Sequence, residues 1–103
     1  MRESYSDVER EVRRIVRDLL DVTYEMITPE ADFICDLGAD SLKYNELMVR
    51  VELDFQLGIP DEDAEFLTNL MRLTEYVYLV EHGRKEKLKE RLHKWRNGLV
   101  KVS

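Results

Sequence analysis

The 103-residue chain is poor in the residues that cross-link or punctuate small proteins: it has one cysteine, two prolines, four glycines and two histidines. A single cysteine excludes an internal disulfide and a cysteine-based zinc site. Cys35 precedes Asp36, whose negative charge raises the pKa of the neighbouring thiol, so a reactive cysteine is not expected. No run of 18 apolar residues occurs and the N-terminus is too charged for a secretory signal, which together predict a cytoplasmic protein.

The sequence also lacks the usual catalytic and nucleotide-binding patterns. Its only histidines, His82 and His93, come late in the chain, so a Ser/His/Asp or Cys/His site would require one of them to fold back. No glycine-rich phosphate loop occurs. The acidic strings at 36–40 and 61–65 lack the glycine that a calcium loop needs at its sixth position. We therefore expect neither an enzyme nor a resident metal ion.

Charge is abundant and unevenly distributed. The net charge is −6, but residues 84–101 contain eight basic and two acidic side chains, which leaves residues 1–83 at −12. An acidic body repels nucleic acid phosphates and suits basic protein partners. Nucleic acid is therefore not an expected partner.

Apolar residues recur at helical spacing through most of the chain. We expect helices at about 7–21, 41–56, 61–67 and 68–81, and a basic amphipathic helix from about 84 to 98. This pattern predicts an all-α fold, a four-helix bundle with a short third helix and an additional C-terminal helix. We expect two units, a domain at 1–83 and an extension at 84–103.

Side-chain caps are expected at the starts of three of these helices. Ser6 and Glu9 form a capping-box pattern for the first. Asp61 is expected to cap the short third helix, and Thr68 or Asn69 the fourth.

The long connection at 23–40 contains three large apolar residues, Phe33, Ile34 and Leu37. We expect all three to pin it to the core, because a loop of this length in a small domain is usually functional or anchored.

The second expected helix is apolar on two faces. One face contains Leu47, Met48, Val51 and Phe55. The other contains Leu42, Val49 and Leu53. Such a helix is either buried all round or buried on one side and bound to a partner on the other.

In the basic tail, Leu88, Leu92, Trp95 and Leu99 follow at helical steps of four, three and four. This helix either docks on a partner or an anionic membrane, or folds back on the acidic body. We favour the second interpretation, because opposite charges attract.

The most informative motif is the seven-residue string Asp-Leu-Gly-Ala-Asp-Ser-Leu at 36–42, where the long connection meets the second helix. Ser41 is expected at a helix N-terminus, where unpaired amides and the helix dipole stabilise an anion such as a phosphodiester. The alternative is that Ser41 only caps the helix.

This string resembles the attachment motif of the acyl carrier protein family. The surrounding sequence, from about residue 8 to 80, resembles the family without gaps, and the Gly-Ala-Asp-Ser form is similar to fatty-acid or polyketide carriers rather than peptidyl carriers. The matching positions outside the motif are Phe33, Glu46, Leu47, Phe55, 59–65 and Tyr76.

The resemblance implies that Ser41, flanked by Asp40 and Leu42, carries a covalent 4′-phosphopantetheine added by a phosphopantetheinyl transferase. A carrier of this kind holds acyl groups as thioesters and does not catalyse. Its implied partners are acyl-processing enzymes of ketosynthase, reductase, dehydratase and acyltransferase types, and a monomer is expected.

The resemblance also implies two surfaces. Residues implied to line an acyl pocket are Phe33, Ile34, Met48, Val51, Ile59, Ala64, Leu67 and Tyr76. Residues implied to dock partners are Asp40, Leu42, Glu46, Val49, Glu52 and Leu53.

The chain departs from the family at Lys43, Tyr44, Asn45, Arg50 and Leu53, which make the second helix less acidic than usual. These departures indicate a specialised carrier with its own enzymes. A different class of function stays open: an unmodified helical adaptor that binds a partner through Leu42, Val49 and Leu53.

Overall fold

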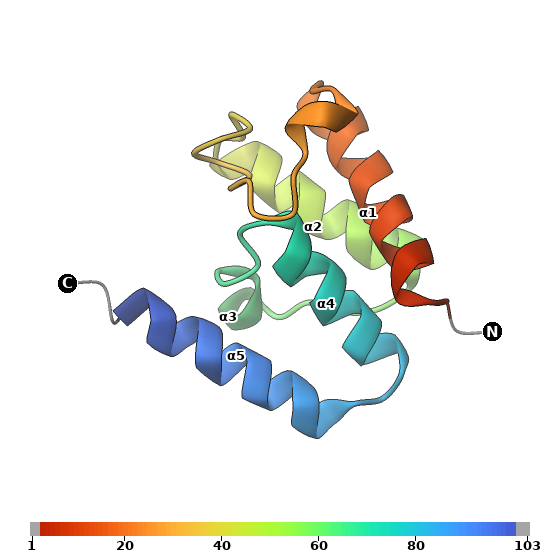
Figure 1. Cartoon of the computed structure of the whole chain (residues 1–103), viewed down its shortest axis with the longest axis vertical. Helices are drawn as coiled ribbons and strands as arrows, with labels where there is room; N and C mark the ends of the chain where they lie inside the picture. The colour runs from red at the N-terminus through yellow and green to blue at the C-terminus, as the bar shows by residue number, and fades with distance from the viewer. Residues whose placement is uncertain (1–2, 101–103) are drawn as a thin grey trace.

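The computed structural model describes residues 3–100, with side chains to residue 98. The order of elements is α1 (Tyr5–Leu20), a 3-10 turn η1 (Tyr24–Met26), α2 (Ser41–Phe55), α3 (Asp61–Ala64), α4 (Leu70–Glu81) and α5 (Lys85–Val100) (Figure 1). The predicted all-α fold with a short third helix and an additional C-terminal helix is confirmed. Within the described residues, no helix is long and apolar enough to cross a bilayer.

The first capping prediction is wrong. The N-cap of α1 is Ser4, whose hydroxyl accepts a hydrogen bond from the Asp7 amide at 3.2 Å. Ser4 has the extended backbone that an N-cap requires, whereas Ser6 already lies within the first helical turn and cannot cap it. The helix therefore begins two residues earlier than the Ser6 and Glu9 pattern predicts.

Of the caps predicted for α3 and α4, the first is wrong and the second is confirmed. Asp61 is not the cap of α3, because it is the first helical residue and Pro60 occupies the N-cap position. An acid in this first turn still interacts favourably with the helix dipole. At α4 the expected cap is confirmed, because the Asn69 side chain accepts from the Arg72 amide at 2.9 Å.

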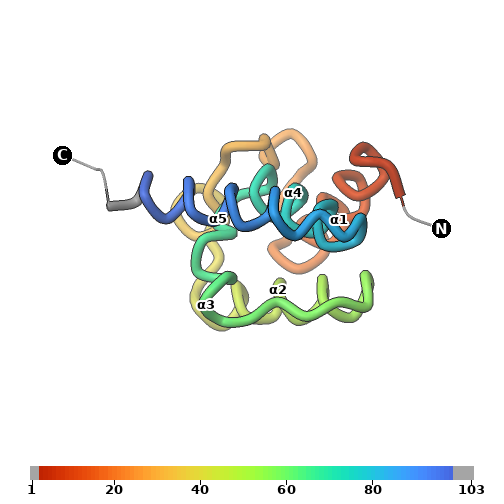
Figure 2. The backbone as a smooth tube through the Cα atoms, turned by 90° about the horizontal axis from the view of Figure 1, so that it is seen from below, coloured from red at the N-terminus to blue at the C-terminus, as the bar shows by residue number. Residues whose placement is uncertain are grey.

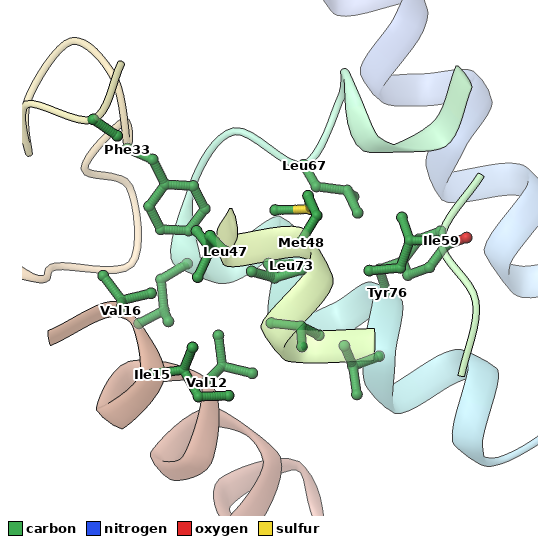
Figure 3. Close-up of a cluster of buried hydrophobic side chains, with 14 of the residues drawn as sticks. Val12, Ile15, Val16, Phe33, Leu47, Met48, Ile59, Leu67, Leu73 and Tyr76 are labelled. Carbon is green, nitrogen blue, oxygen red and sulfur yellow. The ribbon is translucent and has the colours of Figure 1, made fainter. Parts of the chain in front are cut away.

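One hydrophobic core joins the long helices. Figure 3 shows side chains of α1, α2 and α4 in one cluster, to which the connection before α2 contributes the Phe33 ring. The fully buried members include Val12, Ile15, Val16, Phe33, Leu47, Val51, Leu67, Leu70, Leu73 and Val77. The stripes predicted at helical spacing in α1, α2 and α4 therefore face one another.

The long connection is fastened to the turn that precedes α4. The Phe33 amide donates to the Thr68 carbonyl at 2.9 Å, and Asp32 forms an isolated antiparallel bridge with Asn69. Phe33 and Leu37 are buried, as predicted.

Ile34 is not an anchor of this connection, because 46% of it is exposed. The Asp32 carboxylate accepts hydrogen bonds from the Ile34 and Cys35 amides, both at 2.9 Å. This tight side-chain turn directs Ile34 outward, so the prediction for that residue is wrong.

The tail helix α5 folds back beside α4, as we favoured (Figures 1 and 2). Trp95 is buried, and the Arg72 guanidinium lies over its ring at 5.5 Å. Arg91 pairs with Glu75 of α4 at 2.9 Å. Of the apolar residues whose side chains are described, Leu88 and Leu92 are partly buried against the core of this chain and Trp95 is buried in it.

The C-terminal boundary of this helix differs from the prediction. α5 continues to Val100, so the expected stop near Asn97 and Gly98 is wrong. Glycine destabilises a helix interior by about 1 kcal/mol relative to alanine, and α5 continues through Gly98 despite this cost. The Leu99 side chain lies outside the described side chains.

Replacement of Trp95 with alanine is expected to lower the free energy of unfolding by about 3 kcal/mol, the low end of the range for a buried aromatic, because 7% of Trp95 remains exposed. Urea denaturation followed by circular dichroism measures this loss. Lys94→Ala, at the exposed neighbouring position, is the matched control and should change stability by less than about 0.5 kcal/mol. Equal stability of both variants would contradict the docking of α5.

Candidate functional site

Ser41 is the first residue of α2 and is exposed to solvent. The N-cap is the preceding residue, Asp40, whose carboxylate accepts from the Lys43 amide at 2.8 Å. The alternative that Ser41 only caps the helix is therefore incorrect, because Asp40 performs that role. The Ser41 hydroxyl is presented at the surface, where another enzyme can reach it.

The residues before Ser41 explain how the motif presents it. Leu37 and Ala39 are buried in the core, while Gly38 between them adopts φ +82°, a left-handed conformation that glycine tolerates best. The Asp36 carboxylate accepts from the Asp32 amide at 2.8 Å and so closes the loop on itself. Apolar anchors, a turn and a cap thus hold the exposed serine at a defined place.

The local electrostatics suit a phosphodiester on this hydroxyl. The Asp40 side chain satisfies the Lys43 amide, while the Ser41 and Leu42 amides belong to the first helical turn, where no carbonyl lies one turn earlier to accept from them. Such amides and the positive end of the helix dipole stabilise a nearby anion. An exposed phosphodiester therefore fits the residues present.

Cys35 does not compete as a nucleophile. Its side chain is exposed, and the negative charge of Asp32 raises the pKa of the thiol, with a smaller contribution from Asp36. The thiolate is therefore less populated than that of an ordinary cysteine, in agreement with the expectation from sequence.

The residues expected to line an acyl pocket fall into three groups. Six are buried in the core: Phe33, Met48, Val51, Ile59, Leu67 and Tyr76. Figure 3 shows five of these converging from different segments. Ala64 is partly buried at the edge of the core, whereas Ile34 lies on the outside of its loop. The structure thus brings seven of the eight to one apolar interior and leaves Ile34 apart.

A groove of about 420 Å³ lies between α2 and the segment that contains α3. Its apolar lining includes Met48, Ile59 and Ala64, and its polar lining includes Glu52 and Asp61. The groove therefore has an apolar floor with acidic neighbours, next to the core described above.

Tyr44 also lines this groove and is a residue whose role the sequence did not show. Its hydroxyl donates to the Leu67 carbonyl at 2.8 Å and also lies within hydrogen-bond distance of the Ala64 carbonyl. Burial raises the pKa of the Tyr44 phenol, so it stays protonated and a donor. A signal was present, since a tyrosine four residues before Met48 continues the buried stripe, and a buried phenol needs a polar partner.

Glu52 was expected to dock partners but is half-buried and turned toward the α2–α3 connection. Its carboxylate accepts from the Ile59 amide at 2.7 Å. Glu52 therefore stabilises the α2–α3 connection, and its charge is less available to a docking partner than that of a fully exposed acid.

The remaining docking candidates share a surface that we call the α2 outer face: Leu42, Glu46, Val49 and Leu53. The three apolar members are 68%, 51% and 70% exposed. Lys43 pairs with Glu46 at 3.5 Å, which offsets part of the negative charge beside this face. Asp40, at the start of the helix, is exposed as well.

Fold and site together define a small helical carrier protein with an exposed serine at a helix N-terminus. Residues 10–77 match the family model described as phosphopantetheine attachment site, and the chain belongs to this family. Its structure is similar to the acyl carrier protein from Enterococcus faecalis, studied for its high thermal stability. The two share 26% sequence identity over 74% of this chain and 96% of that one, with a TM-score of 0.65.

The chain is thus a member of the acyl carrier protein family, with covalent 4′-phosphopantetheine as its cofactor. As a carrier-type domain it is non-catalytic and acts with acyl-processing enzymes.

Proposed function

We propose that Ser41 Oγ bears the phosphopantetheine arm and that the protein presents acyl thioesters to enzymes of fatty-acid or related lipid or polyketide biosynthesis. A phosphopantetheinyl transferase adds the arm, and ketosynthase, reductase, dehydratase and acyltransferase types are its later partners. The observation that supports this best is the exposed Ser41 at the first position of α2, with the capping role taken by Asp40.

The arm supplies the thiol that forms the thioester. The chain's own residues hold the attachment oxygen at the surface and stabilise the phosphodiester charge through the start of α2. The described histidines lie elsewhere, on α5 and at the end of α4, where the His82 ring contacts the Glu3 carbonyl. The base that activates Ser41 is therefore supplied by the transferase.

Incubation with a phosphopantetheinyl transferase and coenzyme A tests the assignment. We expect intact-mass spectrometry to show the gain of one phosphopantetheine group, and peptide fragmentation to place it on Ser41. Complete absence of a gain would favour the second candidate, an unmodified adaptor that binds a partner through the exposed Leu42, Val49 and Leu53.

The α2 outer face supports a specialised carrier rather than a general fatty-acid carrier. Its members are mostly apolar, and Lys43 adds a positive charge close to the attachment site. Like charges suppress association with basic partner surfaces.

We expect Lys43→Glu to raise the rate of acyl transfer by a general fatty-acid acyltransferase roughly ten-fold, because the added acid improves electrostatic steering. Initial transfer rates at low salt measure the change. Lys94→Glu, on α5, makes the same change of charge away from α2 and is the matched control. An equal rise in both variants would mean that net charge, not the docking face, limits the rate.

We also infer a cytoplasmic monomer in which residues 84–103 stabilise the carrier domain at 1–83. Support comes from α5, whose apolar side contacts α4 of the same chain. Light scattering on the purified protein should give the mass of one chain, and a dimer mass would contradict this inference.

A further inference from the structure

The segment around α3 is held in place by side chains of other elements. α3 has only four residues, and none of them is fully buried. The Tyr44 hydroxyl of α2 donates to the Leu67 carbonyl just beyond α3, and the Tyr76 hydroxyl of α4 donates to the Asp63 carboxylate at 2.8 Å. Together with burial of the following residues Phe66 and Leu67, these bonds fix α3 against the bundle.

The C-terminal helix adds a further contact at the end of this segment. The Arg96 guanidinium lies over the Phe66 ring at 5.3 Å, and Arg72 donates to the Phe66 carbonyl at 3.2 Å. Movement of the segment away from α2 would therefore disturb contacts with α2, α4 and α5 together.

Tyr44 also lies on the route from the attachment site to the groove. It follows Ser41 by three residues, so the two occupy neighbouring positions along one side of α2. The groove continues from Tyr44 past Met48 to Glu52, about 12 Å along the helix. Beyond its floor lie Leu67 and Tyr76, which are packed and nearly inaccessible.

We propose that Tyr44 determines the length of the acyl chain that this carrier shelters. This inference rests on attachment of the arm at Ser41. A short chain occupies the existing groove beside Met48 and Ile59, whereas a longer chain must move the α3 segment and break the Tyr44 hydrogen bond to Leu67.

The dependence of Tm on acyl-chain length can be measured, because each carbon of the acyl chain adds apolar surface. Each methylene buried from water favours the sheltered state by roughly four-fold. A carrier that can continue to open gains stability with every added pair of carbons. A carrier held closed gains stability only until the groove is full, and the rest of the chain stays in water.

The test compares wild type with Tyr44→Phe, each loaded by a transferase with butanoyl, octanoyl or hexadecanoyl coenzyme A. In the wild type, Tm should rise from the butanoyl to the octanoyl form, which fills the length of the groove, and then stay level to hexadecanoyl. In Tyr44→Phe, the unacylated protein should melt lower, but Tm should continue to rise to hexadecanoyl. A five-fold increase in the ratio of folded to unfolded protein corresponds to a rise in Tm of roughly 5 °C in a domain of this size.

Tyr24→Phe is the matched control, because Tyr24 is exposed and lies beside α1, away from the groove. It should keep the level chain-length profile of the wild type. A uniform fall of Tm at every chain length in Tyr44→Phe would mean that the hydroxyl only stabilises the fold, and would overturn the proposal.

Wild-type protein gives a second measurement that does not depend on the variant. Amide NMR shifts of Val51 and Leu67 should be the same in the octanoyl and hexadecanoyl forms, and large differences would overturn the proposal. Mass spectra of the loaded proteins separate the two levels of inference. Absence of an arm on the wild type overturns both proposals, whereas a loaded arm with matching profiles in both proteins overturns this one alone.

Discussion

Replacement of Ser41 with alanine is expected to abolish phosphopantetheine loading completely while leaving stability unchanged to within about 0.5 kcal/mol. The first effect follows because alanine has no oxygen to accept the arm. The second follows because Ser41 is exposed and the capping hydrogen bond belongs to Asp40. Alanine is also the best helix former, so the start of α2 should persist.

Intact-mass spectrometry after incubation with the transferase measures loading, and urea denaturation measures stability. Ser6→Ala is the matched control, since Ser6 is exposed in the first turn of another helix and should load fully when changed. Loading of the Ser41→Ala protein at any other hydroxyl would refute the assignment. A large loss of stability would instead show that Ser41 supports the fold.

Replacement of Phe33 with alanine is expected to cost about 3–5 kcal/mol, the range for a fully buried aromatic. Phe33 has no exposed surface, and its ring lies 6.3 Å from that of Tyr44. Small domains are stable by only about 5–15 kcal/mol, so this loss removes a large fraction of the total. The connection before Ser41 should loosen as well, because Phe33 anchors it.

Urea denaturation at neutral pH measures the cost. Ile34→Ala is the matched control one residue later, and its cost should stay below about 1 kcal/mol because Ile34 is 46% exposed. If the two variants lost equal stability, the connection would not be anchored through Phe33. Hydrogen exchange at Ala39, whose amide donates to the Phe33 carbonyl at 2.9 Å, should rise in Phe33→Ala.

Much of the site was predictable because its determinants are local. The turn at Gly38, the buried Leu37 and Ala39 and the helix that begins at Ser41 all lie within one short string. Helix starts were predictable only to within a few residues, since several serines and aspartates compete for each cap. Ser4 rather than Ser6 caps α1 because only one of them has extended backbone geometry.

The hydrogen-bond partners of the inward-facing polar side chains were not predictable, because helical periodicity shows which residues share a face but not what lies opposite. Tyr44 and Leu67 are 23 residues apart, and no local pattern joins a phenol to that distant carbonyl. From the sequence, Glu52 is expected to face outward, but the α2–α3 connection brings the Ile59 amide to its carboxylate.

The sequence by itself determined the helical class, the apolar stripes, the attachment motif and the amphipathic tail, because each depends on the order of neighbouring residues. Only the tertiary structure decided that α5 lies on α4 and that Tyr44 holds the α3 segment. These outcomes depend on contacts between distant segments, where burial and hydrogen bonding outweigh local preference.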